Sequence, residues 1–246
     1  MRAHGKDQVL GSRHWVVQAA RQRAAEWAVR APRLRLPLID RRLRIPAVVV
    51  GGLLLTGLFV LPERFHLGAP ANLDKSVVDD WIPFFGWTIW IYVSYYLLLV
   101  LAVWLPEDDK RRSDAAYGLV LAAMIGLVIF TLWPTSVMRQ SPGLDGATGF
   151  LWRLLFDVDR PVNALPSLHV ANTCLAAIAL WPSRGPWRGP WRIIVPAWAM
   201  LVILSTLTTK QHYAIDVPGG VLLAAICFVL VRFGVTYGPP PRAAGR

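Results

Sequence analysis

The sequence predicts an all-α membrane protein with six transmembrane helices in a bundle and both termini in the cytoplasm. The first observation behind this prediction is composition: 55% of the 246 residues are hydrophobic and only 17% are charged. Soluble domains carry about a quarter charged residues. The second is that the apolar residues fall in blocks of membrane-spanning length, about 20 residues each. The third is the uneven distribution of Lys and Arg among the segments that connect the blocks.

Six apolar blocks are predicted to be helices, because a chain in lipid must pair its backbone groups internally. The first block is aliphatic around a pair of glycines, and the second and third end beside a Trp and a Pro. The fourth begins at a Pro-Ser pair and ends at Trp-Pro, and cations bound the last two, as expected of helix stops and interfacial anchors. In chain order the blocks cover residues 45–61, 84–105, 115–133, 167–182, 193–208 and 213–233.

These blocks divide the chain into three predicted parts. Residues 1–44 form a basic cytoplasmic segment, residues 45–236 form the membrane domain, and residues 237–246 form a cytoplasmic tail. Within the first part, residues 14–30 could form a basic amphipathic helix on the membrane surface or a loosely ordered tail. Cys174 and Cys227 fall inside predicted helices, where we expect small apolar side chains and no disulfide.

The positive charges predict the orientation of the bundle. With a cytoplasmic N-terminus, 20 of the 26 Lys and Arg residues fall in cytoplasmic segments. The other six are Arg64, Lys75, Arg139, Arg153, Arg160 and Lys210. Because cytoplasmic loops of membrane proteins are enriched in Lys and Arg, both termini are predicted to lie inside. We therefore expect an integral protein of a bacterial cytoplasmic membrane, with its site facing outward.

The net charge of +11 does not indicate nucleic-acid binding. The excess charge lies in the predicted cytoplasmic segments, where it attracts anionic lipid headgroups. A nucleic-acid site would need aromatic residues among the cations, within a known motif, whereas the tryptophans here lie at the ends of the apolar blocks. The expected partner is the lipid bilayer, and nucleic acid is excluded.

The candidate catalytic residues are ionisable groups at the mouths of apolar blocks, where such groups are costly to keep. His169 begins the fourth block, and His212 and Asp216 begin the sixth. On a helix, the four-residue spacing of His212 and Asp216 places both on one face. A carboxylate that accepts from one ring nitrogen fixes the tautomer and stabilises the charged ring, which is what a histidine nucleophile needs. The alternative is a structural hydrogen bond between the last two helices.

His169 has no acidic neighbour in the sequence. With a phosphate between it and His212, His169 could donate a proton to the leaving oxygen, a role that an ordinary pKa of about 6.5 suits. A lone histidine that only packs in the core is the alternative.

Four of the six predicted external cations, Arg139, Arg153, Arg160 and Lys210, lie in the segments around the two histidines. Guanidinium groups bind phosphate oxygens in bidentate fashion, and Lys adds a point charge. Ser167 follows a proline and is a plausible helix cap, so the free N–H groups of that helix start could also bind an anion. A simple cap is the alternative for Ser167. Together these residues predict a phosphate site.

Two histidines and one aspartate could instead bind zinc with an open position. Four cations at the same place would repel a divalent ion, and the sequence offers no second carboxylate cluster for a two-metal site. We therefore expect no metal.

These residues resemble the motifs of the type 2 phosphatidic acid phosphatase superfamily. Its three motifs are Lys-x6-Arg-Pro, Pro-Ser-Gly-His and Ser-Arg-x5-His-x3-Asp. This chain has Arg153-x6-Arg160-Pro161, Pro166-Ser167-Leu168-His169 and Ser205-Thr206-x5-His212-x3-Asp216. Because Thr206 replaces the arginine of the third motif, Lys210 or Arg139 is expected to supply that charge.

The variant pattern is similar to the inositol phosphorylceramide synthase-like branch, which has Asn-x-Phe-Pro-Ser-Leu-His and Lys-x-His-Tyr-x-x-Asp. The matching strings here run from Asn163 to His169 and from Lys210 to Asp216. The segments Trp133-Pro134-Thr135 to Arg139 and Trp81-Ile82-Pro83 also resemble that branch. The resemblance covers roughly residues 75–235.

The resemblance implies a six-helix membrane core and a reaction without metal or other cofactor. It implies that His212 attacks phosphorus to give a phosphohistidine, that Asp216 supports it, and that His169 protonates the leaving group. Arg160, Ser167 and Lys210 would hold the phosphate, helped by Arg139 and Arg153. Asp157 and Asp159 could pair with Arg153 and Arg160, or could contact a hydroxylated or amine headgroup.

The predicted function is a lipid phosphate phosphatase, because an outward site flush with the membrane selects amphipathic phosphates. The alternative is a lipid phosphotransferase, in which an alcohol such as inositol or a ceramide hydroxyl replaces water. The branch resemblance favours transfer, and the phosphatase majority of the superfamily favours hydrolysis. A transporter or scaffold would predict polar residues near mid-membrane, but the centres of the blocks are almost wholly apolar.

Overall fold

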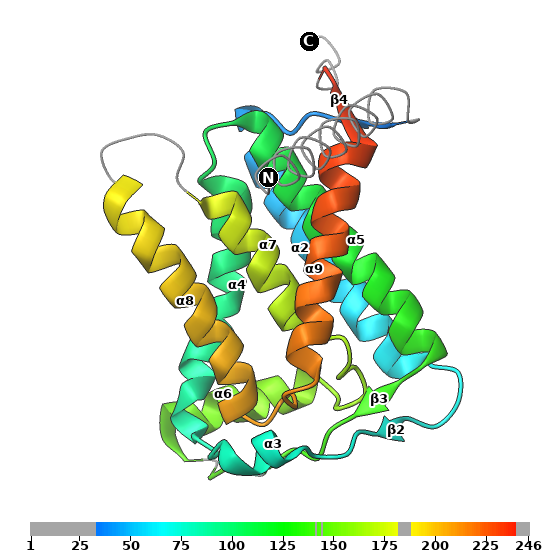
Figure 1. Ribbon diagram of the computed structural model, residues 1–246, viewed down its shortest axis with the longest axis vertical. Coiled ribbons are helices and arrows are strands. Elements are labelled where there is room, and N and C mark those ends of the chain that lie inside the picture. Colours follow the sequence, from blue (N-terminus) through cyan, green and yellow to red (C-terminus); the bar gives the residue numbers. More distant parts are fainter. Residues whose placement is uncertain (1–32, 141, 144, 182–187, 240–246) are drawn as a thin grey trace, which may run out of the picture.

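The computed structural model describes residues 33–140, 142–143, 145–181 and 188–239. Within this part of the chain, six longer helices lie side by side and form a bundle (Figure 1). They are α2 (Arg44–Arg64), α4 (Ile89–Trp104), α5 (Asp109–Leu132), α7 (Leu168–Leu180), α8 (Arg188–Thr208) and α9 (Asp216–Gly234). Short 3-10 turns, η1 (Arg41–Leu43) and η2 (Gly86–Thr88), precede α2 and α4. The predicted surface helix at residues 14–30 lies outside the described residues.

Five helices, α2, α4, α5, α8 and α9, are long and apolar enough to cross a membrane. α7 is apolar but has only 13 residues, a length of about 20 Å, whereas the hydrocarbon core of a bilayer is about 30 Å thick. α7 packs against α4, α5, α8 and α9, so protein covers much of its surface and it need not match the membrane thickness alone (Figure 1). A helix in each predicted block is confirmed, but six spanning helices are not.

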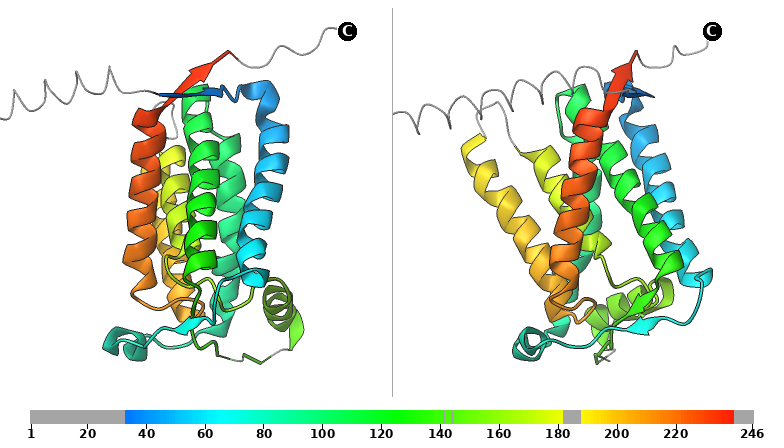
Figure 2. Two further views of the ribbon diagram at one scale, coloured as in Figure 1. Left: turned by 90° about the vertical axis from the view of Figure 1, so that its right-hand side faces the viewer. Right: turned by 45° about the vertical axis from the view of Figure 1, so that its right-hand side comes forward.

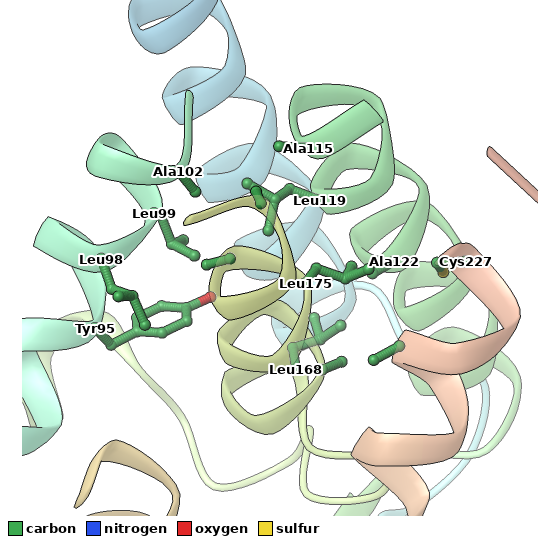
Figure 3. Packing of buried hydrophobic residues seen from close by; sticks show 14 of the residues in the cluster. Tyr95, Leu98, Leu99, Ala102, Ala115, Leu119, Ala122, Leu168, Leu175 and Cys227 are labelled. Atoms are coloured by element: carbon green, nitrogen blue, oxygen red, sulfur yellow. The ribbon is translucent and has the colours of Figure 1, made fainter. Parts of the chain in front are cut away.

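The hydrophobic core surrounds α7. Leu168 and Leu175 of α7 pack among buried residues of α4, α5 and α9, including Leu98, Leu119 and Cys227 (Figure 3). Truncating a buried leucine of this kind costs about 2–5 kcal/mol. The core therefore fixes the position of α7, and with it the first turn that carries His169.

α9 approaches the start of α7 too closely for a side chain at Gly220. A Cβ atom at this position would lie 2.5 Å from the carbonyl oxygen of Ser167 and 2.7 Å from the Cβ of Val170. Contacts below 3.0 Å are not tolerated without a shift, so glycine is required here. This close approach brings the beginnings of α7 and α9 together.

Two helices that the sequence analysis did not predict lie at the end of the bundle where α7 and α9 begin. They are α3 (Val77–Trp81) and α6 (Gly146–Val158). In the left view of Figure 2, α6 is seen along its axis, so it runs across the bundle. Trp152 anchors it, because this side chain is fully buried and its Nε1–H donates to the carbonyl of Gly86 at 3.0 Å.

Two short pairs of parallel strands modify the predicted all-α fold. β2 (Ala71–Asn72) pairs with β3 (Thr135–Ser136) at the end that carries α3 and α6. β1 (Leu34–Pro37) pairs with β4 (Val235–Gly238) at the opposite end (Figure 1). The described fold is thus mostly helical, as predicted, with short strands outside the bundle.

α5 begins six residues before the predicted block. Asp108 caps its start by accepting hydrogen bonds from the backbone N–H groups of Lys110 and Arg111. Arg112 is buried and donates to the carbonyl of Ile39, which offsets the cost of burying its charge. A hydropathy pattern does not predict the first turns of α5, because charged residues there are typical of a loop outside the membrane.

Candidate functional site

The two predicted catalytic histidines meet at the end of the bundle that carries α3 and α6. His169 lies in the first turn of α7, and His212 lies in the turn between α8 and α9. Their ring centroids are 5.9 Å apart, and both residues are 6% exposed. The fold therefore brings together groups that are far apart in the sequence.

His212 is oriented by two acceptors on the same ring nitrogen. Its Nδ1 lies 3.1 Å from Oδ2 of Asp216 and 3.1 Å from the carbonyl oxygen of Ala164. A carbonyl oxygen and a carboxylate can only accept, so Nδ1 must carry the hydrogen. In the neutral ring, Nε2 then holds the free electron pair, and this is the nitrogen that can attack phosphorus.

The contact between His212 and Asp216 forms, although His212 is not on a helix. α9 begins at Asp216 instead of Tyr213, and the four preceding residues make a turn. The N–H of Tyr213 donates to the same Oδ2 of Asp216 at 2.9 Å, which fixes this carboxylate. The predicted contact between the two side chains is present, but a turn, and not a shared helix face, brings them together.

His169 lies between two tyrosine rings. The ring centroids of Tyr92 and Tyr95 are each 4.5 Å from that of His169, and the hydroxyl of Tyr92 is 3.4 Å from its Nδ1. Its Nε2 is buried and has no hydrogen-bond partner within the described residues. Because buried polar atoms are normally paired, this nitrogen is available to a bound group.

A small polar cavity lies against both histidines. Arg139, Gln211, Arg160 and Asp159 also line it. Its volume is about 10 Å³, room for roughly one water molecule. Side chains around the cavity must therefore move apart before a phosphate group can enter.

Arg139 and Asp159 form an ion pair at this cavity. Nη2 of Arg139 lies 2.8 Å from Oδ1 of Asp159, and Nη1 donates to the carbonyl oxygen of Asp159. Asp159 is 7% exposed, whereas Asp157 is exposed on α6. Asp159 thus already neutralises one of the two predicted phosphate-binding cations that line the cavity.

The other predicted phosphate ligands occupy different positions. Arg160 lines the cavity, and its backbone N–H donates to Oε1 of Glu63 at 3.1 Å. Arg153 is exposed on α6 and does not line the cavity. Ser167 is fully buried, and its hydroxyl oxygen accepts from the N–H of Val170 as the cap of α7.

Lys210 points away from the histidines toward α3. Its Nζ donates to the carbonyl oxygens of Asp79 at 2.7 Å and Ile82 at 2.5 Å. Burial lowers the pKa of this lysine, and the nearby charge of Asp79 opposes that shift. Lys210 does not line the polar cavity.

Asp79 holds the same turn from the other side. Its Oδ1 accepts from the N–H of Ala214 at 2.7 Å, and its Oδ2 accepts from Ser76. Burial alone would raise the pKa of this carboxyl, but the hydrogen bonds and the charge of Lys210 outweigh burial and lower it. Asp79 and Lys210 therefore clamp the His212 turn to α3.

The segment after α5 supports the turn before α7. Thr135 is fully buried, its carbonyl oxygen accepts from the N–H of Ala164 at 3.1 Å, and its Oγ1 accepts from Leu165 at 2.9 Å. This frame places the Ala164 carbonyl against His212. Sequence reasoning did not identify Gln211, Glu63, Tyr92 or Asp79 as site residues. Glu63, Tyr92 and Asp79 do not stand out by residue type or spacing. Gln211 lies inside the last motif, and that position is a signal that could have identified it.

Among the described residues, no three His, Cys, Asp or Glu side chains gather in a way that could hold a metal ion. In comparisons with known proteins, the family model described as the PAP2 superfamily matches residues 56–230. No curated protein and no solved structure matched the chain. The matched range begins in α2 and ends in α9, so it contains both histidines and the cavity between them.

Proposed function

The chain belongs to the PAP2 superfamily, which comprises phosphatases and related phosphotransferases, and on this basis we propose that it is a metal-independent lipid phosphate phosphatase. The proposed reaction passes through a phosphohistidine on His212. The observation that carries the proposal is the pair of acceptors on Nδ1 of His212, because they leave Nε2 as the nucleophilic nitrogen. The apolar helices around the site support a substrate held in a bilayer.

In the first half-reaction, the electron pair on Nε2 of His212 forms a bond to phosphorus while the bond between phosphorus and the ester oxygen breaks. His169, in its protonated form, gives the Nε2 proton to the leaving oxygen. Asp216 stabilises the positive charge that develops on the His212 ring. The unpartnered Nε2 of His169 supports its assignment as the proton donor.

In the second half-reaction, a water molecule attacks the phosphohistidine and gives its proton to the now neutral His169. The bond between phosphorus and Nε2 breaks, and its electron pair returns to His212. Inorganic phosphate leaves, and both histidines regain their starting states. No metal takes part in either step.

The phosphate is proposed to lie on Arg139, Arg160 and Gln211, which line the cavity and can donate hydrogen bonds to it. Arg139 must then give up at least part of its pairing with Asp159. Ser167 and Lys210 were expected from the sequence to bind phosphate, but we propose structural roles for them. Ser167 caps α7, and Lys210 holds the His212 turn against the α3 region. Arg153, exposed on α6, is proposed as a contact for the outer part of the headgroup.

A lipid phosphotransferase is the second candidate, and Asp159 favours it. This buried carboxylate lines the polar cavity beside His169. A carboxylate at such a position can accept a hydrogen bond from an alcohol. An acceptor hydroxyl such as that of inositol or ceramide would then replace water in the second half-reaction.

The test uses purified protein in detergent with EDTA and a panel of phosphatidate, isoprenyl phosphates and phospholipid headgroup donors. We expect phosphate release without an added acceptor. This activity should be lost in His212→Ala and kept in His66→Ala. His66 is a matched control because it lies outside the cavity, where its Nδ1 is 2.8 Å from the carbonyl oxygen of Gly68. Product that forms only with added inositol or ceramide would establish transfer.

Trapping the intermediate tests the mechanism itself. With a radiolabelled substrate and rapid denaturation in base, the wild-type protein should yield an acid-labile, base-stable phosphoprotein, and His212→Ala should form none. Activity that disappears with EDTA and returns with a divalent metal would instead support metal chemistry. No turnover in any arm would contradict the proposal and favour a protein that does not catalyse.

A further inference from the structure

A large apolar cavity begins at His169. It has a volume of about 340 Å³ and lies between α2, α4 and α6. Four residues line both this cavity and the polar one: Phe59, Asp159, Leu168 and His169. Thr56, Asp159, His169 and Asn172 are its polar lining residues, and the rest of the lining is aliphatic or aromatic, including Leu154 and Val158 of α6.

A second apolar cavity continues the first along the bundle. It has a volume of about 400 Å³ and shares Leu55, Thr56, Tyr96 and Leu99 with the first. α2 and α4 form its sides, and α5 contributes residues to both cavities, including Val120 and Ala123. The two cavities therefore lie end to end in one groove, which we call the α2–α4 groove.

The α2–α4 groove is longer than one leaflet of a bilayer is thick. Its lining on α2 and the preceding turn runs from Val60 near the histidines to Leu43 at the opposite end. This is a length of about 25 Å at 1.5 Å per residue, compared with about 30 Å for the whole hydrocarbon core. One leaflet accounts for only half of that thickness.

We propose that the α2–α4 groove binds the single, long apolar chain of the phosphorylated lipid whose phosphate reaches His212. The proposal rests on the proposed function and assigns the class of lipid: one linear chain longer than a leaflet, as in a polyisoprenyl phosphate. The continuity with the polar cavity joins the chain to the phosphate. The end-to-end order of the two cavities fits one long chain better than two short chains side by side.

Two glycines keep the far part of the groove open. Gly51 and Gly52 line the second cavity, and a Cβ added at either position would have no atom within 4 Å. Because a Cβ atom meets no neighbour at either position, a larger side chain there can extend into the second cavity. Both positions lie about two helical turns from Phe59, so substitutions there leave the junction with the polar cavity unchanged.

The test measures kcat/KM for two phosphates, a long polyisoprenyl phosphate and geranyl phosphate, whose chain is too short for the second cavity. Gly51→Phe and Gly52→Phe should each lower kcat/KM for the long substrate about tenfold or more and leave that for geranyl phosphate within about twofold. Gly57→Phe is the matched control, because Gly57 is on the same helix, has the same free space and lines neither cavity. It should change neither value.

Equal losses for both substrates, or no loss for either, would overturn the proposal. A second measurement does not depend on turnover: a long-chain lipid phosphate with a photoreactive group at its far end is bound to His212→Ala. Labelling between Pro46 and Gly52 or between Val100 and Val103 supports the groove, and labelling on α8 contradicts it. If no phosphate is hydrolysed in any arm, the proposed function fails while labelling still decides the binding site.

Discussion

At the scale of single residues, the geometry around His212 links structure most directly to chemistry. Asp216 and the carbonyl of Ala164 both accept from Nδ1, and Tyr213 fixes the carboxylate through its backbone N–H. Three groups from two separate segments thus define one tautomer. A hydrogen-bond acceptor at position 216 is essential to that arrangement.

Asp216→Asn is expected to lower kcat by about 10²–10⁴-fold with little change in folding. If the Asn oxygen takes the place of Oδ2, it still accepts from Tyr213 and from Nδ1 of His212, and the NH₂ group takes the place of Oδ1. The tautomer is then kept, but the neutral amide no longer stabilises the positive charge that develops on the His212 ring when Nε2 attacks phosphorus. The measurement is kcat in detergent, together with thermal unfolding to show that the protein is folded.

Asp157→Asn is the control, because Asp157 is exposed on α6 outside the polar cavity. It should retain wild-type kcat. A similar kcat for Asp216→Asn and the wild type would contradict the role of the Asp216 charge, as would an equal loss in both variants.

Residue types and spacing in the sequence predicted His169, His212 and Asp216 as the candidate trio, and the structure brings these three together. They could not predict the Ala164 carbonyl or the tyrosine rings around His169, because backbone groups and distant aromatic residues carry no local signal. The ion pair of Arg139 with Asp159 was also missed. It depends on how the segments before and after α6 meet, which composition does not encode.

At the scale of elements, α3 and the turn before α9 form a clamp. Lys210 has a φ of 54°, a left-handed conformation that is uncommon for a residue other than glycine. Its Nζ is held by two carbonyl oxygens of the α3 region, and Asp79 binds the turn at Ala214. These bonds support a backbone conformation that the turn requires to present His212.

Lys210→Met is expected to lower kcat and to destabilise the fold by about 1–3 kcal/mol, because two buried carbonyl groups lose their donor. The inhibition constant for inorganic phosphate should stay within about twofold, since Lys210 does not line the polar cavity. The measurements are kcat, the inhibition constant and thermal unfolding. Lys75→Met, at an exposed lysine on the same end, is the control and should change none of them.

A direct phosphate ligand would give the opposite pattern. Losing its charge-assisted hydrogen bond would raise the inhibition constant about tenfold or more. That outcome would return Lys210 to the role first predicted from its position beside His212.

The predictability of the elements follows their composition. Apolar blocks predicted α2, α4, α5, α7, α8 and α9 to within about six residues at each end, because helices in contact with lipid and with the bundle core are apolar over most of their surface. α3 and α6 were missed because each is too short or too mixed in composition to form such a block. α6 buries mainly Gly149, Trp152 and Leu155, a pattern that depends on its partner α4.

At the scale of the whole molecule, the two ends of the bundle differ in chemistry. The end with β1 and β4 carries clustered basic residues, including Arg35, Arg41 and Arg42. The end with α3 and α6 carries the polar cavity, where Asp159 pairs with Arg139. Because Lys and Arg favour the cytoplasmic side, this asymmetry predicts that the cavity opens outward.

Cysteine labelling in intact cells tests the orientation. Asp157→Cys places a thiol on an exposed residue of α6, and Glu107→Cys places one on an exposed residue at the opposite end. A membrane-impermeant maleimide should label the first variant before lysis and the second only after the membrane is opened. The parent chain gives the background, since its Cys227 is fully buried and Cys174 lies within α7. Labelling of Glu107→Cys alone in intact cells would show the opposite orientation. The proposed substrate would then have to reach His212 from the cytoplasmic leaflet.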